Sequence, residues 1–347
     1  MSSSYRETYV GASEREKIIT ELYAQGFKTS PEIAEKTGIP ERTARRYLKN
    51  IKDGSFVVDG VTPDDYEEEC DATIEYLLSR QEVNQSRSEK ERDQHVYLTS
   101  DRPVSVTLFS DIHWGSPTVD YKSLVRDTGM VRDEEGAYAF CLGDLGENWI
   151  GTLSGISAEQ EITINQEKSG IEWWLGQLSE KLPVVVSGNH DNRTKYLAHI
   201  DYVQQMCRGL NLLYGSDQVI FDLHLGDAVW RWKCRHQFKG NSQWNETHAI
   251  EKNGKLYDGF DFGAHGHFHR PTIIRPYYQS LLKKICYACN IGTYKIADDY
   301  ATRLGFESQH TEYTATIIYY PDGRVVIPNG STLEENLRYL RWARKNF

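Results

Sequence analysis

The sequence lacks the features of a membrane or secreted protein. Its 347 residues contain no run of about 18 consecutive apolar residues, and Met1–Tyr9 is polar rather than a charged segment followed by an apolar one. We therefore expect no membrane span, no secretory signal and no membrane partner. The six cysteines are scattered, mostly within apolar runs where a reduced thiol packs, so the sequence favours a reducing, cytoplasmic location.

A cysteine pair and the net charge argue against two further classes of protein. Cys286 and Cys289 form an isolated C-x-x-C in a strand-like run, and because no second pair accompanies it we expect buried thiols rather than a zinc site. The formal net charge of -10 argues against a protein that coats nucleic acid through bulk electrostatics. Any contact with nucleic acid must therefore come from a local basic patch.

Such a patch lies near the N-terminus, where short helices are predicted over residues 13–26, 30–38 and 40–53. The tract Ser30–Asn50 resembles a DNA-binding helix-turn-helix, in which the third helix would enter the major groove. We therefore predict a DNA-binding domain over residues 1–54. A helical bundle for protein contacts or homo-oligomer formation is the alternative. The basic face of the third helix consists of Arg42, Arg45, Arg46, Lys49 and Lys52.

The rest of the chain divides into a connector and a larger unit. Residues 55–102 are mostly polar and charged, with an acidic run at Asp64–Asp71 and a short predicted helix at Thr73–Leu78, which favours a helical or flexible connector. Residues 103–330 are predicted to form the larger domain, and residues 331–347 a closing helix.

Strands and helices alternate in the first half of the larger domain. Strand-like runs at Val104–Phe109, Tyr138–Leu142 and Pro183–Val186 each end in a polar cluster, and a helix is predicted within Glu159–Glu180. This order predicts a layered α/β fold in which ligands gather at the carboxyl ends of strands. Consecutive strands follow, at Gln218–Leu225, Ala228–Phe238, Phe262–His269, Lys284–Ile291, Thr314–Tyr320 and Val325–Ile327.

Side chains that bind metals lie at these strand ends. Carboxylate and imidazole groups together suit manganese, iron or zinc, and the absence of thiolates argues against a structural zinc site. A carboxylate such as that of Asp144 can bridge two cations, and two cations can clamp a phosphate and lower the pKa of a shared water. The candidates are Asp111, His113, Asp144, Asn189, His190, His236, His265, His267 and His269.

Five motifs in chain order resemble the signatures of the calcineurin-like metallophosphoesterase superfamily. They are Asp111-Ile112-His113, Gly143-Asp144, Gly188-Asn189-His190-Asp191, His236 and Gly266-His267-Phe268-His269. Asn290-Ile291-Gly292-Thr293 resembles the turn that often follows the last motif. The resemblance covers about Val104 to Ile327 and implies a four-layer α/β/β/α sandwich, in which two sheets pack face to face with helices outside.

The resemblance also implies a role for each residue. Asp111, His113, Asp144 and His269 would hold one divalent ion, and Asp144, Asn189, His236 and His267 the other. Mn2+ is the expected ion, with iron, zinc and magnesium as alternatives. A hydroxide bridging the ions would attack phosphorus, while His190 would protonate the leaving oxygen and Asp191 would help to orient its ring.

Two histidines leave alternatives open. His236 is followed by glutamine where the superfamily often has glycine, so His224 and His248 are its rivals as a ligand. His265 lies two residues before His267 and would share its face if the strand continues. It is either a residue that contacts the metal ligands without binding the metal, or a buried core histidine.

The combination of modules suggests a function. It resembles helix-turn-helix-bearing metallophosphoesterases of phages and prophages, and the larger domain resembles bacterial nucleases of the repair type. We therefore predict a nuclease that hydrolyses DNA phosphodiester bonds. A phosphomonoesterase acting on a protein or small molecule, with the helical module serving assembly, is the alternative, because the same metal site supports both reactions. A DNA-binding regulator with a vestigial esterase fold is a third possibility.

Overall fold

The computed structural model describes residues 12–53, 63–151, 154–155, 160–240, 242, 244–257, 259–296, 313–328 and 332–347. Contacts between residues divide the chain into two compact units, Met1–Ser88 and Glu89–Phe347, and each is described by itself. Within the described ranges, no helix is both long and apolar enough to cross a membrane.

The first unit contains a bundle of three helices, α1 (Ala12–Ala24), α2 (Ser30–Thr37) and α3 (Glu41–Asp53), close to the predicted positions. Gly38 ends α2 in the left-handed conformation, with a φ of 72° that a residue with a side chain rarely adopts. The bundle buries a small apolar core, and the five basic side chains of α3 are exposed on its surface. The core consists of Ile19, Leu22, Ile33, Ile39, Ala44, Tyr47 and Leu48.

The predicted connector contains one continuous helix and a strand. Helix α4 (Pro63–Arg92) spans 30 residues, far more than the short helix predicted at Thr73–Leu78. Its apolar side chains, among them Ile74, Leu77 and Leu78, are exposed, so no amphipathic burial pattern revealed its length. Strand β1 (His95–Leu98) follows and joins the second unit.

Two six-stranded sheets form the centre of the second unit, counted over the described residues. In the first sheet the order is β1-β6-β7-β8-β10-β9, with β6 at Gln218–Leu225, β7 at Ala228–Arg235, β8 at Phe262–His265, β10 at Lys284–Asn290 and β9 at Ile273–Gln279. In the second sheet the order is β12-β11-β2-β3-β4-β5, with β12 at Val325–Val326, β11 at Ala315–Tyr319, β2 at Val104–Phe109, β3 at Ala137–Cys141, β4 at Val184–Val186 and β5 at Leu213–Gly215.

The sheets pack face to face through a continuous apolar core. Phe140 of β3 meets Phe221 of β6 and Trp232 of β7 edge-on, with ring centroids 5.3 and 5.2 Å apart. Strand β2 is buried along its whole length, and β6 buries every second residue from Val219 to Leu225, so both have the predicted bounds.

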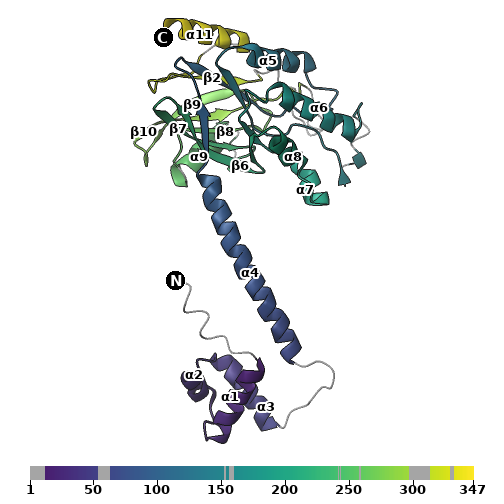
Figure 1. Cartoon of the computed structure of the whole chain (residues 1–347), viewed down its shortest axis with the longest axis vertical. Helices are drawn as coiled ribbons and strands as arrows, with labels where there is room; N and C mark the ends of the chain where they lie inside the picture. The colour runs from purple at the N-terminus through teal and green to yellow at the C-terminus, as the bar shows by residue number, and fades with distance from the viewer. Residues whose placement is uncertain are drawn as a thin grey trace. The chain divides into compact units, whose positions relative to one another are not determined.

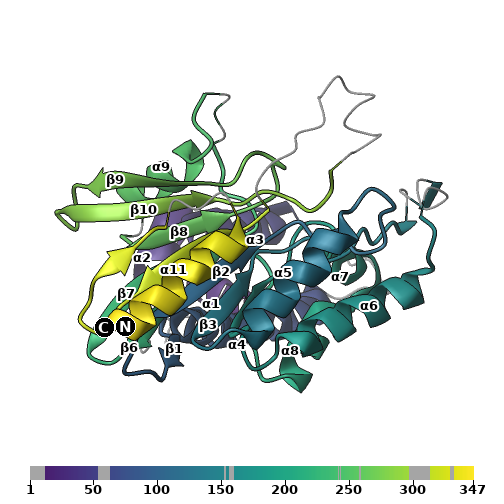
Figure 2. The same cartoon turned by 90° about the horizontal axis from the view of Figure 1, so that it is seen from above.

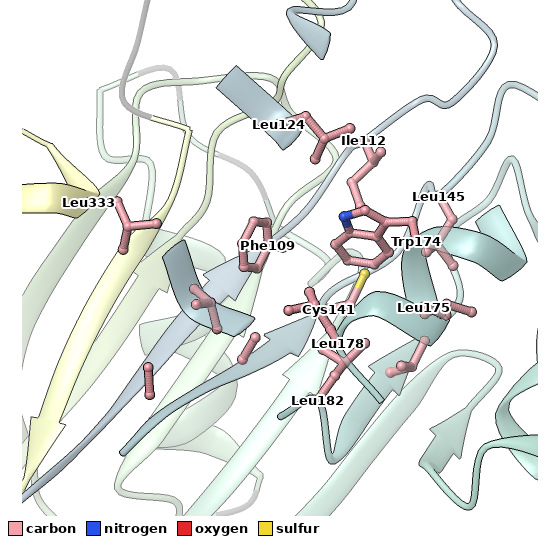
Figure 3. Packing of buried hydrophobic residues seen from close by; sticks show 14 of the residues in the cluster. Phe109, Ile112, Leu124, Cys141, Leu145, Trp174, Leu175, Leu178, Leu182 and Leu333 are labelled. Carbon is pink, nitrogen blue, oxygen red and sulfur yellow. The ribbon is translucent and has the colours of Figure 1, made fainter. Parts of the chain in front are cut away.

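Helices cover the outer faces of the sheets. Helices α5 (Tyr121–Asp133), α6 (Ile164–Gln177) and α11 (Leu333–Asn346) lie along the sheet that contains β2 and β3 (Figures 1 and 2). Figure 3 shows the core beneath them, where Trp174 and Leu175 of α6 approach Cys141 and Phe109. Helix α9 (His248–Leu256) contacts β8, β9 and β10 of the other sheet. The short helices α7 (Asn192–Ala198) and α8 (Tyr202–Gly209) complete the unit.

The architecture is therefore a mixed α/β sandwich, as predicted, with differences at the sheet edges. Strands β1, β5 and β9 were not predicted: β1 alternates exposed and buried residues within a polar tract, and β9 is an edge strand that contains Pro276. Strand β8 ends at His265 rather than continuing to His269. The expectation that His265 and His267 lie on the same face of one strand is therefore wrong. The predicted C-x-x-C spans β10, where Cys286 and Cys289 are free and buried in different clusters.

Candidate metal centre

The candidate ligands follow strands that run in parallel. Asp111 comes directly after β2, Asp144 after β3, and Asn189 after β4 in the same parallel set. His236 follows β7, and His267 and His269 follow its parallel neighbour β8. The carboxyl ends of neighbouring parallel strands lie at one edge of a sheet, so the fold gathers these side chains from distant parts of the sequence.

An unusual backbone conformation marks the same residues. Asp111, His113, Asp144, His267 and His269 all adopt positive φ values, between 49° and 71°. Such conformations cost free energy in residues with a side chain and persist where the surrounding structure enforces them, typically at functional sites. Five of the seven predicted ligands are therefore held in strained turns directly after their strands.

Two glycines allow the turns to approach one another. A Cβ atom at Gly188 would lie 2.0 Å from Asp144 Oδ1, and one at Gly266 would lie 1.9 Å from Ser110 Oγ. Neither contact is possible for a real side chain, so only glycine fits at these two positions. The glycines that precede the asparagine and histidine motifs thus permit the close packing of the site.

The first ligand group combines Asp111, His113 and His269. The Nε2 atoms of His113 and His269 lie 3.0 Å apart, and His269 Nε2 lies 3.3 Å from Asp111 Oδ1. Asp111 is fully buried and accepts hydrogen bonds from the backbone N–H of His267 at 2.9 Å and from Ser110 Oγ at 2.5 Å. These bonds fix the carboxylate while leaving Oδ1 directed at the imidazoles.

The second group combines Asp144, His236 and His267. His236 Nε2 lies 3.1 Å from Asp144 Oδ2, 3.2 Å from His267 Nδ1 and 3.1 Å from Asn189 Oδ1. The other ring nitrogen of His236, Nδ1, lies 2.8 Å from the carbonyl oxygen of Leu142. A hydrogen bond there places the proton on Nδ1 and leaves Nε2 free as a ligand.

Asp144 links the two groups. Its Oδ1 accepts a hydrogen bond from the backbone N–H of His190 at 2.9 Å. Its Oδ2 lies 3.1 Å from His236 Nε2 in the second group and 3.9 Å from His113 Nε2 in the first. One carboxylate oxygen therefore faces both groups, as a bridging ligand must.

The electrostatics favour the ligand form of Asp111, Asp144 and His113. Burial by itself would raise the pKa of Asp111, but the imidazoles of His269 and His236 lower it to about 2. Burial likewise opposes ionisation of Asp144, yet His236 and His190 hold its pKa well below the usual range. Burial lowers the pKa of His113 to about 4. Ionised carboxylates and neutral imidazoles are the forms that bind divalent cations. His236 differs: burial would lower its pKa, but the carboxylates of Asp144 and Asp111 raise it to about 10, so it must give up a proton when a cation binds.

The residues fit a pair of divalent cations. Imidazole nitrogens and carboxylate oxygens converge within 3.0–3.3 Å of one another in both groups, and all come from residues of the types that manganese, iron and zinc prefer. Imidazole nitrogens this close to each other and to two buried carboxylates form a donor set that a cation between them would satisfy.

The His190 ring contacts Glu147, a residue that none of the sequence motifs includes. Glu147 is fully buried, and its Oε2 lies 3.3 Å from His190 Nδ1 and 3.4 Å from His113 Nδ1. Its Oε1 accepts from Lys295 Nζ at 2.7 Å. Burial opposes the charge of Glu147, but His113, His190 and Lys295 lower its pKa. The only signal in the sequence was the position of Glu147 three residues after Asp144.

Asp191 has a different place from the one expected. Its carboxylate accepts from the backbone N–H groups of Gly188 at 2.8 Å and Leu145 at 3.1 Å, and from Tyr202 Oη at 3.2 Å. The expectation that Asp191 orients the His190 ring is therefore corrected: the contacts at His190 Nδ1 come from Glu147 and Arg193. Burial, together with the nearby Asp144, raises the pKa of Asp191 to about 6.

The structure distinguishes between the alternative histidines. His236, rather than His224 or His248, lies beside Asp144. His224 stacks on Tyr97 at a sheet edge, with ring centroids 4.4 Å apart, and His248 begins α9. His265 is fully buried between the rings of Phe238 and Phe268, and burial lowers its pKa to about 4.

The turn after the last histidine motif supports Asp111. Thr293 Oγ1 donates a hydrogen bond of 2.8 Å to the carbonyl oxygen of Asp111, and the backbone N–H of Tyr294 donates to the same oxygen at 3.3 Å. This turn thus holds the backbone of the first motif at Asp111.

Comparison with known proteins finds distant likenesses among solved structures. No protein-family model matches the chain, and no curated protein matches it. Among solved structures, YfkN from Bacillus subtilis, a calcineurin-like phosphoesterase, is 13% identical, with 70% of this chain and 100% of that chain covered and a TM-score of 0.33. A Vps29 single mutant from Entamoeba histolytica is 12% identical, with coverages of 62% and 84% and a TM-score of 0.34. Vps29 from Chaetomium thermophilum is 11% identical, with coverages of 65% and 96% and a TM-score of 0.35.

The sandwich fits a metallophosphoesterase-like fold. Its two sheets are rich in parallel strands, and clusters of His and Asp lie at the strand ends. The basic residues Arg42, Arg45, Arg46, Lys49 and Lys52 belong to the other compact unit, where they form a face of α3.

Proposed function

We propose that the chain is a dinuclear-metal-dependent phosphodiesterase, and specifically a nuclease that hydrolyses DNA phosphodiester bonds. The observation that carries the proposal is the pair of ligand groups joined by Asp144 Oδ2 at the carboxyl ends of parallel strands. Two cations at such a site would neutralise the phosphate and lower the pKa of the water that attacks phosphorus.

The distances support the ligand sets that the resemblance implies. Asp111, His113, Asp144 and His269 would hold one divalent cation, and Asp144, Asn189, His236 and His267 the other. Mn2+ is the proposed ion, with iron, zinc and magnesium as alternatives, because the donor set is oxygen and imidazole nitrogen without thiolate.

His190 would act as the general acid. Its Nδ1 lies 2.9 Å from the carbonyl oxygen of Glu147 and 3.3 Å from the Glu147 carboxylate. With Nδ1 held in this way, Nε2 is left to face the site, 3.9 Å from Asp144 Oδ2. In this proposal Nε2 donates the proton to the oxygen that leaves phosphorus, and Glu147 stabilises the orientation of the ring.

The first unit supports a nucleic-acid substrate. The five basic side chains of α3 are all exposed, whereas the opposite face of the helix, with Ala44, Tyr47 and Leu48, is buried. A basic face on the third helix of a small bundle matches the arrangement of helix-turn-helix DNA readers. We propose that this face brings the catalytic unit to DNA.

The proposal is tested by comparing substrates with purified protein and Mn2+. Single-stranded DNA, duplex DNA, a synthetic diester and a synthetic monoester are compared, with Asp144→Ala as the control. We expect cleavage of the diesters, and loss of activity in Asp144→Ala by at least 100-fold because both ligand groups lose a member. Preference for the monoester would support a phosphomonoesterase instead, and activity that survives Asp144→Ala would show a contaminant.

The role of α3 is tested separately. Replacing Arg42 and Arg46 with glutamine is expected to weaken DNA binding and to reduce the slope of its salt dependence by about one for each lost phosphate contact. Turnover of the small synthetic diester is expected to stay unchanged. Arg338→Gln, at an exposed position on α11, serves as the matched control. Unchanged DNA affinity would show that the bundle does not bind DNA.

A further inference from the structure

Trp149 is an aromatic residue that belongs to the site rather than to the core. It follows the buried Asn148, whose positive φ of 46° turns the chain. Among the described residues, Trp149 joins none of the buried apolar clusters, and it is only partly exposed. Its ring instead meets the His190 ring edge-on, with centroids 5.1 Å apart. A large apolar ring is therefore held beside the proposed general acid.

Arg193 is the second part of this arrangement. Its guanidinium carbon lies 4.5 Å from the Trp149 ring centroid. Its Nη1 donates to the carbonyl oxygen of Glu147 at 2.7 Å and lies 3.0 Å from His190 Nδ1. These contacts fix the cation against both the indole and the histidine.

The charge of Arg193 is left available for an anion. Over the part of the chain that the structure describes, no carboxylate lies within 4 Å of the partly buried Arg193 guanidinium, and the charges of Asp144 and Glu147 act on it only from farther away. A guanidinium has five N–H donors, and the contacts above use only those on Nη1. A partly buried arginine without an ion-pair partner, at the rim of a proposed phosphate site, suits a phosphate oxygen.

We infer that Trp149 and Arg193 form a subsite for one nucleotide of a single-stranded nucleic acid, next to the leaving group. The indole would stack on the base, and the guanidinium would bind the phosphate that flanks it. The inference rests on the proposed function, because His190 defines the leaving-group side only if it is the general acid. It adds a substrate class: a base can reach the indole only when it is unpaired.

Dinucleotides test the inference, because they are too short to engage the basic face of α3. The substrates are thymidylyl-thymidine and its two analogues in which one or the other base is absent, with Mn2+ present. Stacking of a base on an aromatic ring changes affinity by roughly tenfold. We expect one abasic analogue to have a KM about tenfold higher in the wild-type protein, with kcat within twofold.

Variants separate stacking from a structural role. In Trp149→Ala the higher KM of the abasic analogue, relative to thymidylyl-thymidine, should disappear. In Trp149→Phe this difference in KM should remain. Trp342→Ala, which removes a tryptophan that is 57% exposed on α11, is the matched control and should behave as wild type. If Trp149→Ala slows all three substrates equally, or if neither abasic analogue is penalised, the inference is wrong.

The arginine is tested with a terminal phosphate. Arg193→Gln should abolish the gain in affinity that an added terminal phosphate gives the dinucleotide, while Arg193→Lys should retain part of it. Calorimetric titration of the dinucleotides onto metal-free protein measures the same preferences without turnover. Absence of Mn2+-dependent cleavage of any diester would refute the proposed function, whereas loss of base preference in the titration would refute the subsite alone.

Discussion

At the scale of single residues, Glu147 shows how a buried charge can organise a site. It contacts two imidazoles through one carboxylate oxygen and Lys295 through the other. Both members of the Glu147–Lys295 pair are nearly inaccessible, with side-chain exposures of 1% and 8%. Breaking such a pair leaves an uncompensated charge in the interior, which is costly.

We therefore predict that Lys295→Met lowers the free energy of unfolding by about 3 kcal/mol. Urea denaturation of the metal-free protein measures the loss. The double variant Glu147→Gln/Lys295→Met should lose less than the two single variants together, because no lone charge remains. Lys284→Met is the matched control: its partner Asp261 is 14% exposed, but Lys284 itself is 49% exposed and already largely solvated, so the cost should stay below about 1 kcal/mol. Equal losses for Lys284→Met and Lys295→Met would contradict this account.

Glu167, a buried residue near the candidate metal centre, makes a pH-dependent contribution to the stability of the fold. It is fully buried, it accepts from the backbone N–H of Asn148 at 3.0 Å and from Gln160 Nε2 at 2.6 Å, and burial raises its pKa from 4.5 to about 7. Because the folded pKa lies above the ordinary value, this contribution to stability is complete below about pH 4.5 and is lost as the pH rises through 7.

Glu167→Gln should therefore flatten the pH dependence of stability. At pH 5 the variant and the wild-type protein should differ little, and at pH 8 the variant should be more stable by up to about 3 kcal/mol, since one pKa unit corresponds to about 1.4 kcal/mol. Chemical denaturation between these pH values provides the measurement. Glu172→Gln, an exposed position on the same helix, should leave the profile as it is. A variant that is less stable at pH 8 would disprove the assignment.

At the scale of elements, the sequence predicts strands whose apolar residues are continuous or alternate regularly. Strands β2 and β6 have the predicted bounds, whereas the edge strands β1 and β9 have polar or proline-containing sequences that become strands only by pairing with a neighbour. The same limit applies to the site. Residues after strands could be recognised by their motifs, but the roles of Glu147, Asn148 and Lys295 depend on contacts between distant parts of the chain. Glu147 and Lys295, for example, are 148 positions apart.

The three-helix bundle is an element whose stability can be tested. Its core contains few residues, and Ile33 of α2 is fully buried within it. Small cores leave little surplus stability. We predict that Ile33→Ala costs about 2–4 kcal/mol and unfolds the bundle at ordinary temperature. Circular dichroism should show loss of helix, while turnover of the small diester stays unchanged; a concurrent loss of turnover would show that the units depend on each other.

At the scale of the whole molecule, two compact units predict two unfolding transitions. The candidate ligands all lie in the unit Glu89–Phe347. Mn2+ should therefore raise the melting temperature of one calorimetric transition and leave the other unchanged, because a cation stabilises only the unit that binds it. Chelation should reverse the shift.

Asp144→Ala provides the control for this experiment. The variant removes a buried carboxylate that pairs with His236, so without metal its transition should lie below that of the wild-type protein. Addition of Mn2+ should then produce no rise. A shift in both transitions, or one that persists in Asp144→Ala, would place the ion outside the proposed centre.

The shared oxygen of Asp144 has a consequence for how the centre fills. Because Oδ2 faces both ligand groups, an ion in either position would orient the carboxylate for the second and relieve its repulsion from Asp111. Metal binding should then be cooperative. A sample supplied with half the required ions should contain mostly molecules with no ion and molecules with both ions bound.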